Sequence, residues 1–315
     1  MMDLHISTGM KIFMADPMVR GLGKIGSIPD PDPGQVVVNR NMKTLLICTD
    51  FSEAASHAAR YGCMLATQYN IGYITLFHAW QAVIPTTTLP LSTDDKQIAK
   101  ASIEQLKDLK EELEKTTGDD IHIRIRTENL SLGESINSIC KEENADMVVM
   151  GISGKTKFEK SFIGTNAINV SKTSKYPVLI VPAQAAVEPV HSILFTCDLK
   201  EVVATTDLEP VAEILELFHA PLFVLNVDDK NRHFSPQTPE EMYQMHHIFD
   251  KYKPRYAFTD NKDVTAGITA YAEKNNISLI ITIPKHYNFI QQLFHRSTTQ
   301  RLIYQSPVPL LTLHE

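Results

Sequence analysis

Short apolar runs and amphipathic stretches alternate along the chain from Met42 onward. KTLLICTD at 43–50 is apolar up to its final Asp, which is typical of a strand buried on both faces. A helix is predicted next, from Ser52 to Tyr69, with Ser52 as its N-cap. The pattern then predicts a strand at 72–80, a helix near 95–116, a strand at 121–130, a helix at 134–144, a strand at 145–151, a helix near 165–174 and a strand at 177–183. This order predicts a parallel sheet covered by helices.

The same order of segments returns in the second part of the chain. HSILFTCDLKEV at 191–202 resembles KTLLICTDFSEA at 43–54, with Asp198 falling where Asp50 falls. Further matching strands are predicted over APLFVLNVDD at 220–229, NISLIITIPK at 276–285 and SPVPLLTLHE at 306–315. The sequence therefore predicts two tandem Rossmann-like α/β domains, each a five-stranded parallel sheet with helices on both faces.

The domain boundaries follow from this repeat. We place the first domain at 42–183 and the second at 190–315, with AQAAVEP at 183–189 as the linker. Residues 1–41 have no sustained helical or strand period and are punctuated by Gly and PDPDPG. They also lack the apolar core and cleavage site of a signal peptide. We expect a flexible extension here, or a start codon called too early, with Met42 as the natural beginning.

Composition and charge limit the kinds of partner and site that the chain is expected to have. The 315 residues are 43% hydrophobic and 21% charged, which is typical of a soluble globular protein. The net charge of -7 argues against nucleic acid or an anionic membrane as the main partner, and no apolar run approaches the roughly 20 residues of a membrane helix. The four cysteines have no CxxC or metal-finger spacing and no HExxH pattern occurs, so no metal site is predicted. Buried reduced thiols would fit a cytoplasmic location.

Glycines gather in one stretch, MGISGKTKFEKSFIGTNA at 150–167. Gly151 and Gly154 follow a predicted strand end, where ligands bind in open parallel sheets, and glycine lets a ligand approach bare backbone. Gly164 precedes a predicted helix, whose free N–H groups and dipole favour an anion. A phosphate chain running from the loop to the helix start would use both elements. Two alternatives stay open: the glycines only form turns, or VMGISGKT is a Walker A loop, in which Val149 occupies the first glycine's position.

The spacing of these glycines favours a phosphate site over the two alternatives. Gly151-x-x-Gly154, nine residues, then Gly164-Thr165 resembles the phosphate and ribose signature of the ATP-binding branch of the universal stress protein family. LLICTDFSEAA resembles that family's first strand and turn, TLFHA its second strand, and the run from MGISGKT to KYPVLIVP its C-terminal third. The resemblance implies an adenine nucleotide alpha hydrolase-like fold with ATP, with or without Mg²⁺, as the cofactor.

The resemblance also implies which residues bind the nucleotide. They are Thr49, Asp50, Ala79, Met150, Gly151, Ser153, Gly154, Gly164, Thr165 and Asn166. Asp50 would accept from the adenine amino group or contact the base edge, Ala79 would supply backbone at the adenine, and Met150 would form an apolar floor. The remaining residues from Gly151 onward would wrap the ribose and phosphates. For Asp50 a second interpretation stays open, since a carboxylate between a strand and a helix is often a helix cap.

The second domain departs from this signature. TIPKHYNFIQQLFHRSTTQ at 282–300 stands in place of the glycine stretch and contains no glycine. Pro284 fixes φ and removes a donor, and His295-Arg296 stand where the last glycine would be. We predict that the second domain does not bind ATP in this manner and that Asp198 is structural.

The function expected from the resemblance is nucleotide-dependent regulation in a stress response, with ATP in the first domain and the second domain as a partner. The motifs show no dedicated catalytic base and no pair of metal carboxylates, so any hydrolysis would be slow. The alternatives are a slow Mg-dependent ATPase or phosphotransferase, and a scaffold that binds no nucleotide. Family members pair through their last strands, so PVLIVP and PVPLLTL should face each other as an intramolecular pseudo-dimer. Pairing of two chains into a homodimer stays open.

Overall fold

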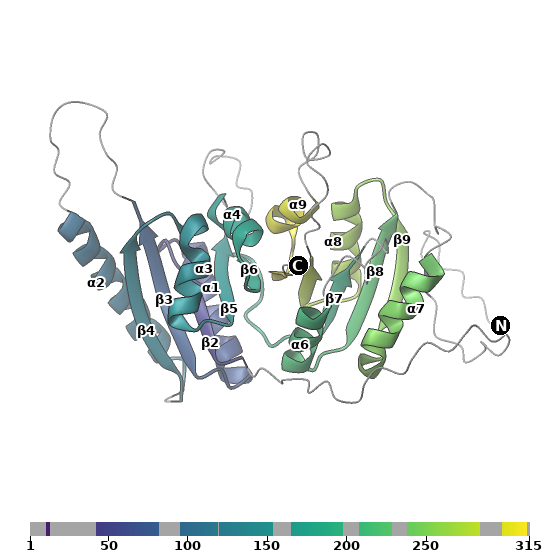
Figure 1. The fold of residues 1–315 in the computed structure, drawn as a ribbon, viewed down its shortest axis with the longest axis horizontal. Coiled ribbons are helices and arrows are strands. Elements are labelled where there is room, and N and C mark those ends of the chain that lie inside the picture. Colours follow the sequence, from purple (N-terminus) through teal and green to yellow (C-terminus); the bar gives the residue numbers. More distant parts are fainter. Residues whose placement is uncertain are drawn as a thin grey trace, which may run out of the picture.

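The computed structural model describes residues 11–12, 42–81, 95–118, 120–153, 165–197, 208–228, 238–283 and 298–313. Within these residues the strands form one 11-stranded sheet, in the order β1-β9-β8-β7-β10-β11-β6-β5-β2-β3-β4 (Figure 1). Strands β2 to β6 form one half of the sheet and β7 to β11 form the other. We refer to the corresponding parts of the chain as the first half and the second half.

The first half alternates strands and helices as predicted. Its elements are β2 (Thr44–Cys48), α1 (Glu53–Gln68), β3 (Tyr73–Trp80), α2 (Asp95–Glu114), β4 (His122–Asn129), α3 (Leu132–Glu143), β5 (Met147–Ile152), α4 (Thr165–Thr173) and β6 (Val178–Pro182). Its five strands are all parallel. Helix α3 begins earlier than predicted, because Gly133 lies inside its first turn rather than before it. Asn144 ends that helix in the left-handed conformation, with φ of 52°.

The second half has the same architecture. Its elements are β7 (Ile193–Thr196), α6 (Glu209–Phe218), β8 (Leu222–Asp228), α7 (Thr238–Phe249), a 3-10 helix η1 (Asp250–Tyr252), β9 (Arg255–Asp260), α8 (Val264–Lys274), β10 (Leu279–Thr282), α9 (Thr298–Gln305) and β11 (Leu310–Thr312). These five strands are again parallel. In both halves the first strand lies between the second and the fourth. The predicted repeat of Rossmann-like topology is therefore confirmed.

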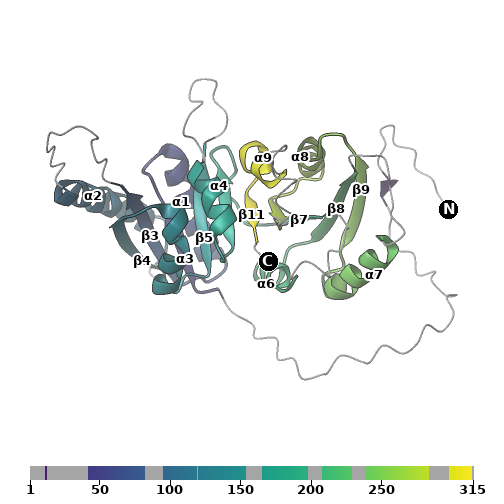
Figure 2. The ribbon, with the colours of Figure 1, turned by 45° about the horizontal axis from the view of Figure 1, so that its top comes forward.

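The two halves join through their last strands. Strand β11 pairs with β6 in antiparallel orientation, with Leu311 opposite Leu179 and Leu310 opposite Ile180. Figure 2 shows β11 beside the strands of the first half. Leu311 is 0% exposed and Leu179 is 1% exposed. The Thr312 hydroxyl also donates to the Val178 carbonyl, at 3.4 Å. The predicted facing of the two last strands is confirmed, and the sheet runs through the joint without a break.

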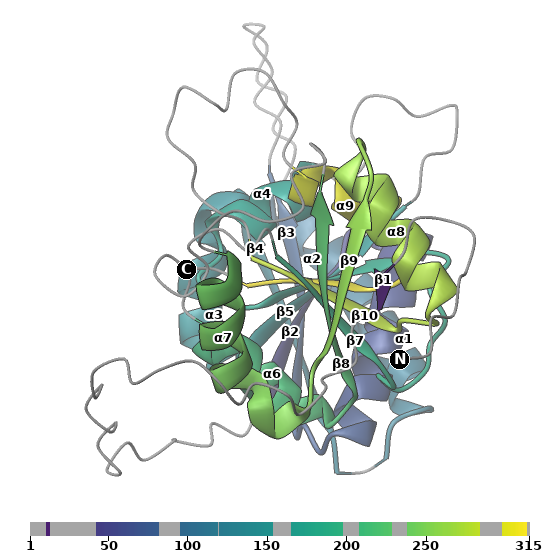
Figure 3. The same ribbon diagram turned by 90° about the vertical axis from the view of Figure 1, so that its right-hand side faces the viewer.

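Helices cover both faces of the sheet, as predicted (Figure 3). One buried cluster contains side chains of α1, α2, α6 and α7, and the other contains side chains of α3, α4, α8 and α9. Helix α2 shows why these segments are helical, because Leu106, Leu109 and Leu113 fall on one face at spacings of three and four and are all buried. Both clusters draw residues from the two halves of the chain, so each core crosses the joint.

The segment that connects the halves is held by side chains of α1. His57 Nε2 lies 2.9 Å from the carbonyl oxygen of Ala185 and, because a carbonyl only accepts, Nε2 donates. Tyr69 Oη donates to the Val190 carbonyl and accepts from the Val190 amide, at 3.4 and 3.2 Å. The Tyr69 ring also contacts Phe218 of α6 edge-on, with ring centroids 4.9 Å apart. The linker is thus fixed against the first half.

A strand that the sequence did not indicate lies at the edge of the second half. Strand β1 (Lys11–Ile12) pairs antiparallel with β9, with Lys11 opposite Phe258 and Ile12 opposite Ala257. No sustained strand period occurs in residues 1–41, and no strand was predicted at these two residues. The rest of that segment, up to residue 41, lies outside the described residues.

The four cysteines are free thiols. Cys48, Cys63 and Cys140 are buried as predicted, and Cys197 is partly exposed. Burial raises the pKa of the Cys63 and Cys140 thiols to about 12, which keeps both protonated at neutral pH. Among the helices of the described ranges, none combines the length and the apolar character required to span a bilayer.

Candidate functional site

The predicted site residues that the structure describes converge on one edge of the first half. Thr49 and Asp50 follow β2, while Met150 and Gly151 belong to the end of β5, its parallel neighbour, with Cys48 opposite Met150. Ala79 lies near the end of β3, on the other side of β2. The carboxyl ends of β2 and β5 form the point where the strand order reverses, which is where open α/β sheets bind ligands.

Only some of the predicted phosphate-binding residues lie in the part of the chain that the structure describes. Ser153 directly follows β5 and is partly exposed. Thr165 and Asn166 are exposed and open the nine-residue helix α4, which returns from this edge toward β6. Gly154 and Gly164 lie outside the residues that the structure describes. The start of α4 offers backbone N–H groups without intrahelical partners.

A tight turn carries Asp50 at the end of β2. The Thr49 amide donates to the Phe77 carbonyl of β3 at 2.9 Å, and Thr49 Oγ1 accepts from the Phe51 amide at 3.0 Å. Phe51 has φ of 64°, a left-handed conformation that residues with a side chain adopt rarely. The exposed Asp50 accepts from the Ser52 amide through Oδ1, at 3.0 Å. Among the described residues, none hydrogen-bonds to its Oδ2, so a carboxylate oxygen is available at this edge.

The cap of α1 is Ser52 and not Asp50. Ser52 has extended backbone angles, and its Oγ accepts from the Ala55 amide at 3.2 Å. The predicted N-cap is therefore confirmed, and Asp50 is not needed for that purpose.

Ser52→Ala is expected to lower the free energy of unfolding by about 1 kcal/mol, because it removes the N-cap acceptor. Ser131 precedes α3 in the same way but makes no side-chain cap bond. Ser131→Ala is therefore a matched control that should change stability by less than ~0.5 kcal/mol. Urea unfolding followed by far-UV circular dichroism measures both, and equal losses would contradict the assignment of the cap.

Gly151 is explained by packing against α1. A Cβ atom at this position would lie 2.2 Å from the carbonyl oxygen of Ala54 and 2.8 Å from the amide nitrogen of Ala55. The first turn of α1 thus crosses directly over the end of β5. This close approach sets the start of α1 against the end of β5, and it requires glycine whether or not a ligand is bound.

Three further polar side chains near this edge were not predicted. His78 Nδ1 lies 2.7 Å from the Thr49 carbonyl oxygen, and its ring contacts Phe51 with centroids 4.4 Å apart. Trp80 Nε1 and Thr127 Oγ1 are buried, and neither has a hydrogen-bond partner among the residues that the structure describes. A signal for His78 was present, since it interrupts the apolar strand TLFHAW directly before Ala79. Trp80 is the chain's single tryptophan, so its fluorescence reports on the first half.

Comparison with known proteins agrees with this geometry. A model of the universal stress protein family matches residues 41–182. Universal stress protein Slr1230 of Synechocystis is 23% identical over 303 residues, which cover 86% of this chain and 99% of that protein. Residues 41–182 therefore form a universal stress protein domain.

Two other comparisons are consistent with this domain, one in sequence and one in fold. Universal stress protein MJ0531 of Methanocaldococcus jannaschii is 28% identical over 142 residues, which cover 44% of this chain and 81% of that protein. The crystal structure of a universal stress protein from Archaeoglobus fulgidus is 17% identical, with a TM-score of 0.67, and covers 86% of this chain and 98% of that chain. At that identity the structural likeness concerns the fold alone. It extends over both halves.

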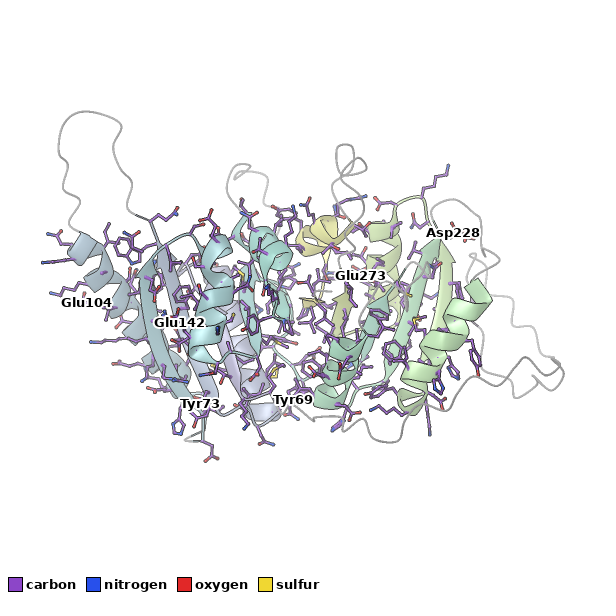
Figure 4. The ribbon with its side chains drawn as sticks, in the orientation of Figure 1. Tyr69, Tyr73, Glu104, Glu142, Asp228 and Glu273 are labelled. Carbon is purple, nitrogen blue, oxygen red and sulfur yellow. The ribbon has the colours of Figure 1, made fainter. Side chains whose placement is uncertain are left out.

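The second half of the chain repeats the turn at the end of its first strand with other residues. Cys197 stands where the first half has Thr49, and its carbonyl accepts from Asn226 Nδ2 of β8 at 3.1 Å. Asp228 ends β8 at the corresponding edge (Figure 4). Ile283 is partly buried after β10, whereas Asp198 and the predicted obstructing residues from Pro284 to Arg296 lie outside the described residues. The prediction that this half does not bind ATP stays a prediction.

A metal site would need several ligand side chains in one place. Within the described ranges, no three side chains among His, Cys, Asp and Glu come together as a metal site would require. The described candidate site therefore offers a carboxylate, hydroxyls and backbone amides. These groups suit a polar organic ligand with an anionic part.

Proposed function

We propose that this protein binds ATP, or a related adenine nucleotide, at the carboxyl edge of its first half. One observation carries the proposal. The exposed carboxylate of Asp50 and the start of helix α4 lie at the same edge of the sheet. At this edge the neighbouring strands β2 and β5 end, and the strand order reverses between them. The carboxylate suits the amino group of the base, and the helix start suits phosphate.

The individual contacts follow the order of the residues along this edge. Asp50 would accept from the adenine amino group, and the backbone of Ala79 would lie at the base. Met150 is 6% exposed and packs with the core on the same face as Ala79, so it would form an apolar floor. Gly151 and Ser153 would lie along the ribose and the first phosphate. The residues expected to hold the phosphates are Gly154, Gly164, Thr165 and Asn166.

The two parts of the chain would then differ in their roles. We propose a nucleotide-binding domain at 42–183 and a partner domain at 190–315 that lacks the glycine signature. The joint between β6 and β11 supports a mechanical connection between them, because both cores cross it. A nucleotide-dependent change in the first domain would reach the second through this joint, which is the basis for a regulatory function in the stress response. Mg²⁺ would accompany the phosphates.

The test is a titration of the full chain with Mg-ATP, by calorimetry and by Trp80 fluorescence. Binding at one site per chain is expected, and it should be lost in a Gly154→Val, Gly164→Val double variant. A second site per chain would show that the second half also binds. A folded protein that binds no ATP would contradict the proposal and favour a scaffold.

Asp50→Asn tests the base contact directly. The amide retains the oxygen that accepts from Ser52 but replaces the other acceptor with a donor. The variant should bind Mg-ATP about tenfold more weakly, because it loses a charge-assisted hydrogen bond. It should bind Mg-ITP better than the wild type, since hypoxanthine carries an oxygen where adenine carries the amino group. An unchanged preference for ATP over ITP would exclude Asp50 from the base site.

A further inference from the structure

His78 makes a directed contact that the nucleotide signature does not include. It lies on β3, one residue before Ala79, and is partly buried. Its Nδ1 lies 2.7 Å from the carbonyl oxygen of Thr49. A carbonyl oxygen only accepts, so Nδ1 carries the proton and donates. The imidazole is thereby fixed in one orientation against the turn that carries Asp50.

The second half contains the same contact made by a different residue. Asn226 lies 148 residues after His78, which is also the offset between Cys197 and Thr49 and between the two first strands. Asn226 Nδ2 donates to the Cys197 carbonyl at 3.1 Å. The donor nitrogen of asparagine and Nδ1 of histidine are equally far from Cβ along the side chain. The position therefore requires an N–H donor at that distance from the backbone and not an imidazole as such.

In the first half this donor supports a strained turn. Phe51 holds a left-handed φ of 64°, and its ring lies against the His78 ring at 4.4 Å. Thr49 Oγ1 accepts from the Phe51 amide, and the Thr49 carbonyl accepts from His78 Nδ1. Thr49 is therefore held in the turn by two contacts. A left-handed residue with a side chain persists where surrounding contacts determine it. His78 supplies two of these contacts, one polar and one with its ring.

We propose that His78 is the positioning residue of the nucleotide site: its Nδ1–H holds the Thr49 carbonyl and so fixes the direction of the Asp50 carboxylate toward the base. This inference rests on the proposed function. His78 acts through the turn and need not touch the nucleotide. Its effect should therefore appear in the discrimination between bases, which depends on the direction of one carboxylate, more than in the binding of phosphates.

Three substitutions of His78 separate the role of the donor from that of bulk. His78→Asn keeps a donor at the same distance from Cβ, as in the second half. His78→Gln keeps an amide but moves its donor one bond farther, and His78→Leu removes the donor. Asn226→Leu is the matched control, because it removes the equivalent contact in the half without the glycine signature.

The measurement is the ratio of the dissociation constants for Mg-ITP and Mg-ATP, with the full chain. His78→Leu and His78→Gln should lower this ratio about tenfold, the loss expected for one directed hydrogen bond. His78→Asn should stay within about threefold of the wild type, and Asn226→Leu should leave the ratio unchanged. If His78→Leu does not fold, His78→Gln decides, since it retains a polar side chain. Circular dichroism checks the fold of each variant.

The outcomes for this proposal and for the proposed function are separate. A wild type that binds no ATP would contradict the proposed function and, with it, the positioning role that rests on it. A wild type that binds ATP, with a folded His78→Gln variant of unchanged ratio, would overturn the positioning role alone. Failure of His78→Asn to retain the ratio would overturn it as well, because the second half shows that asparagine can make this contact.

Discussion

Gly151→Ala is expected to destabilise the protein by about 3 kcal/mol, the upper part of the range for overpacked sites. The added Cβ would lie 2.2 Å from the carbonyl oxygen of Ala54 and 2.5 Å from its carbonyl carbon. These are backbone atoms at the start of α1, so no side-chain rotation relieves the clash. Either α1 moves away from β5 or the end of β5 bends, and both changes disturb the buried Ala54 and Ala55.

Gly72→Ala is the matched control for this substitution. Gly72 also stands beside a strand, before β3, and a Cβ added there would meet no atom within 4 Å. It should change stability by less than ~1 kcal/mol. Urea unfolding followed by Trp80 fluorescence gives both free energies. A Gly151→Ala variant as stable as Gly72→Ala would mean that α1 does not approach β5 as closely as described.

The close packing at Gly151 changes the interpretation of the glycine stretch at 150–167. The sequence suggested that Gly151 serves a ligand, because glycine follows a strand end at a predicted binding edge. The structure gives a sufficient reason within the fold, the crossing of α1. Loss of ATP binding in a Gly151 variant would therefore not identify a ligand contact, whereas Asp50→Asn leaves the fold intact and tests the site alone.

The elements and their order could be predicted because they depend on local pattern. Buried parallel strands such as β2 and β6 are continuous apolar runs, and Ser52 marks the start of α1 by its own chemistry. The joint of β6 with β11 followed from the family resemblance. The two-residue strand β1 was missed, since its pairing with β9 depends on residues far along the chain and leaves no local pattern.

The candidate site was predictable only in part, for a related reason. Motif spacing indicates residues that lie near a strand end, such as Asp50 and Met150. It does not indicate contacts between a side chain and a distant backbone group, such as the bond from His78 to the carbonyl of Thr49, 29 residues away. The burial of Trp80 Nε1 likewise becomes visible only when its surroundings are known. Such contacts determine how precisely a site is oriented.

Leu311→Asp is expected to destabilise the first half as well as the second, by more than about 4 kcal/mol. Leu311 is 0% exposed and lies opposite Leu179 across the joint, and both belong to the same buried cluster. A carboxylate there would lose its hydration without gaining a partner. The substitution lies in β11, yet the cores cross the joint, so the unfolding signal of Trp80 in the first half should shift together with the circular dichroism signal of the whole chain.

Tyr243→Asp provides the control, because it places the same charge in the second half on a side chain that is 73% exposed. It should change the free energy of unfolding by less than ~0.5 kcal/mol. A Trp80 transition that stays unchanged in Leu311→Asp, while part of the circular dichroism signal is lost, would show that the first half folds independently. In that case the joint could not transmit a nucleotide-dependent change, and the regulatory role proposed for the second half would lose its structural basis. A common shift of both signals would instead show that the two halves unfold together. The joint could then transmit the effect of a ligand at Asp50 to the second half.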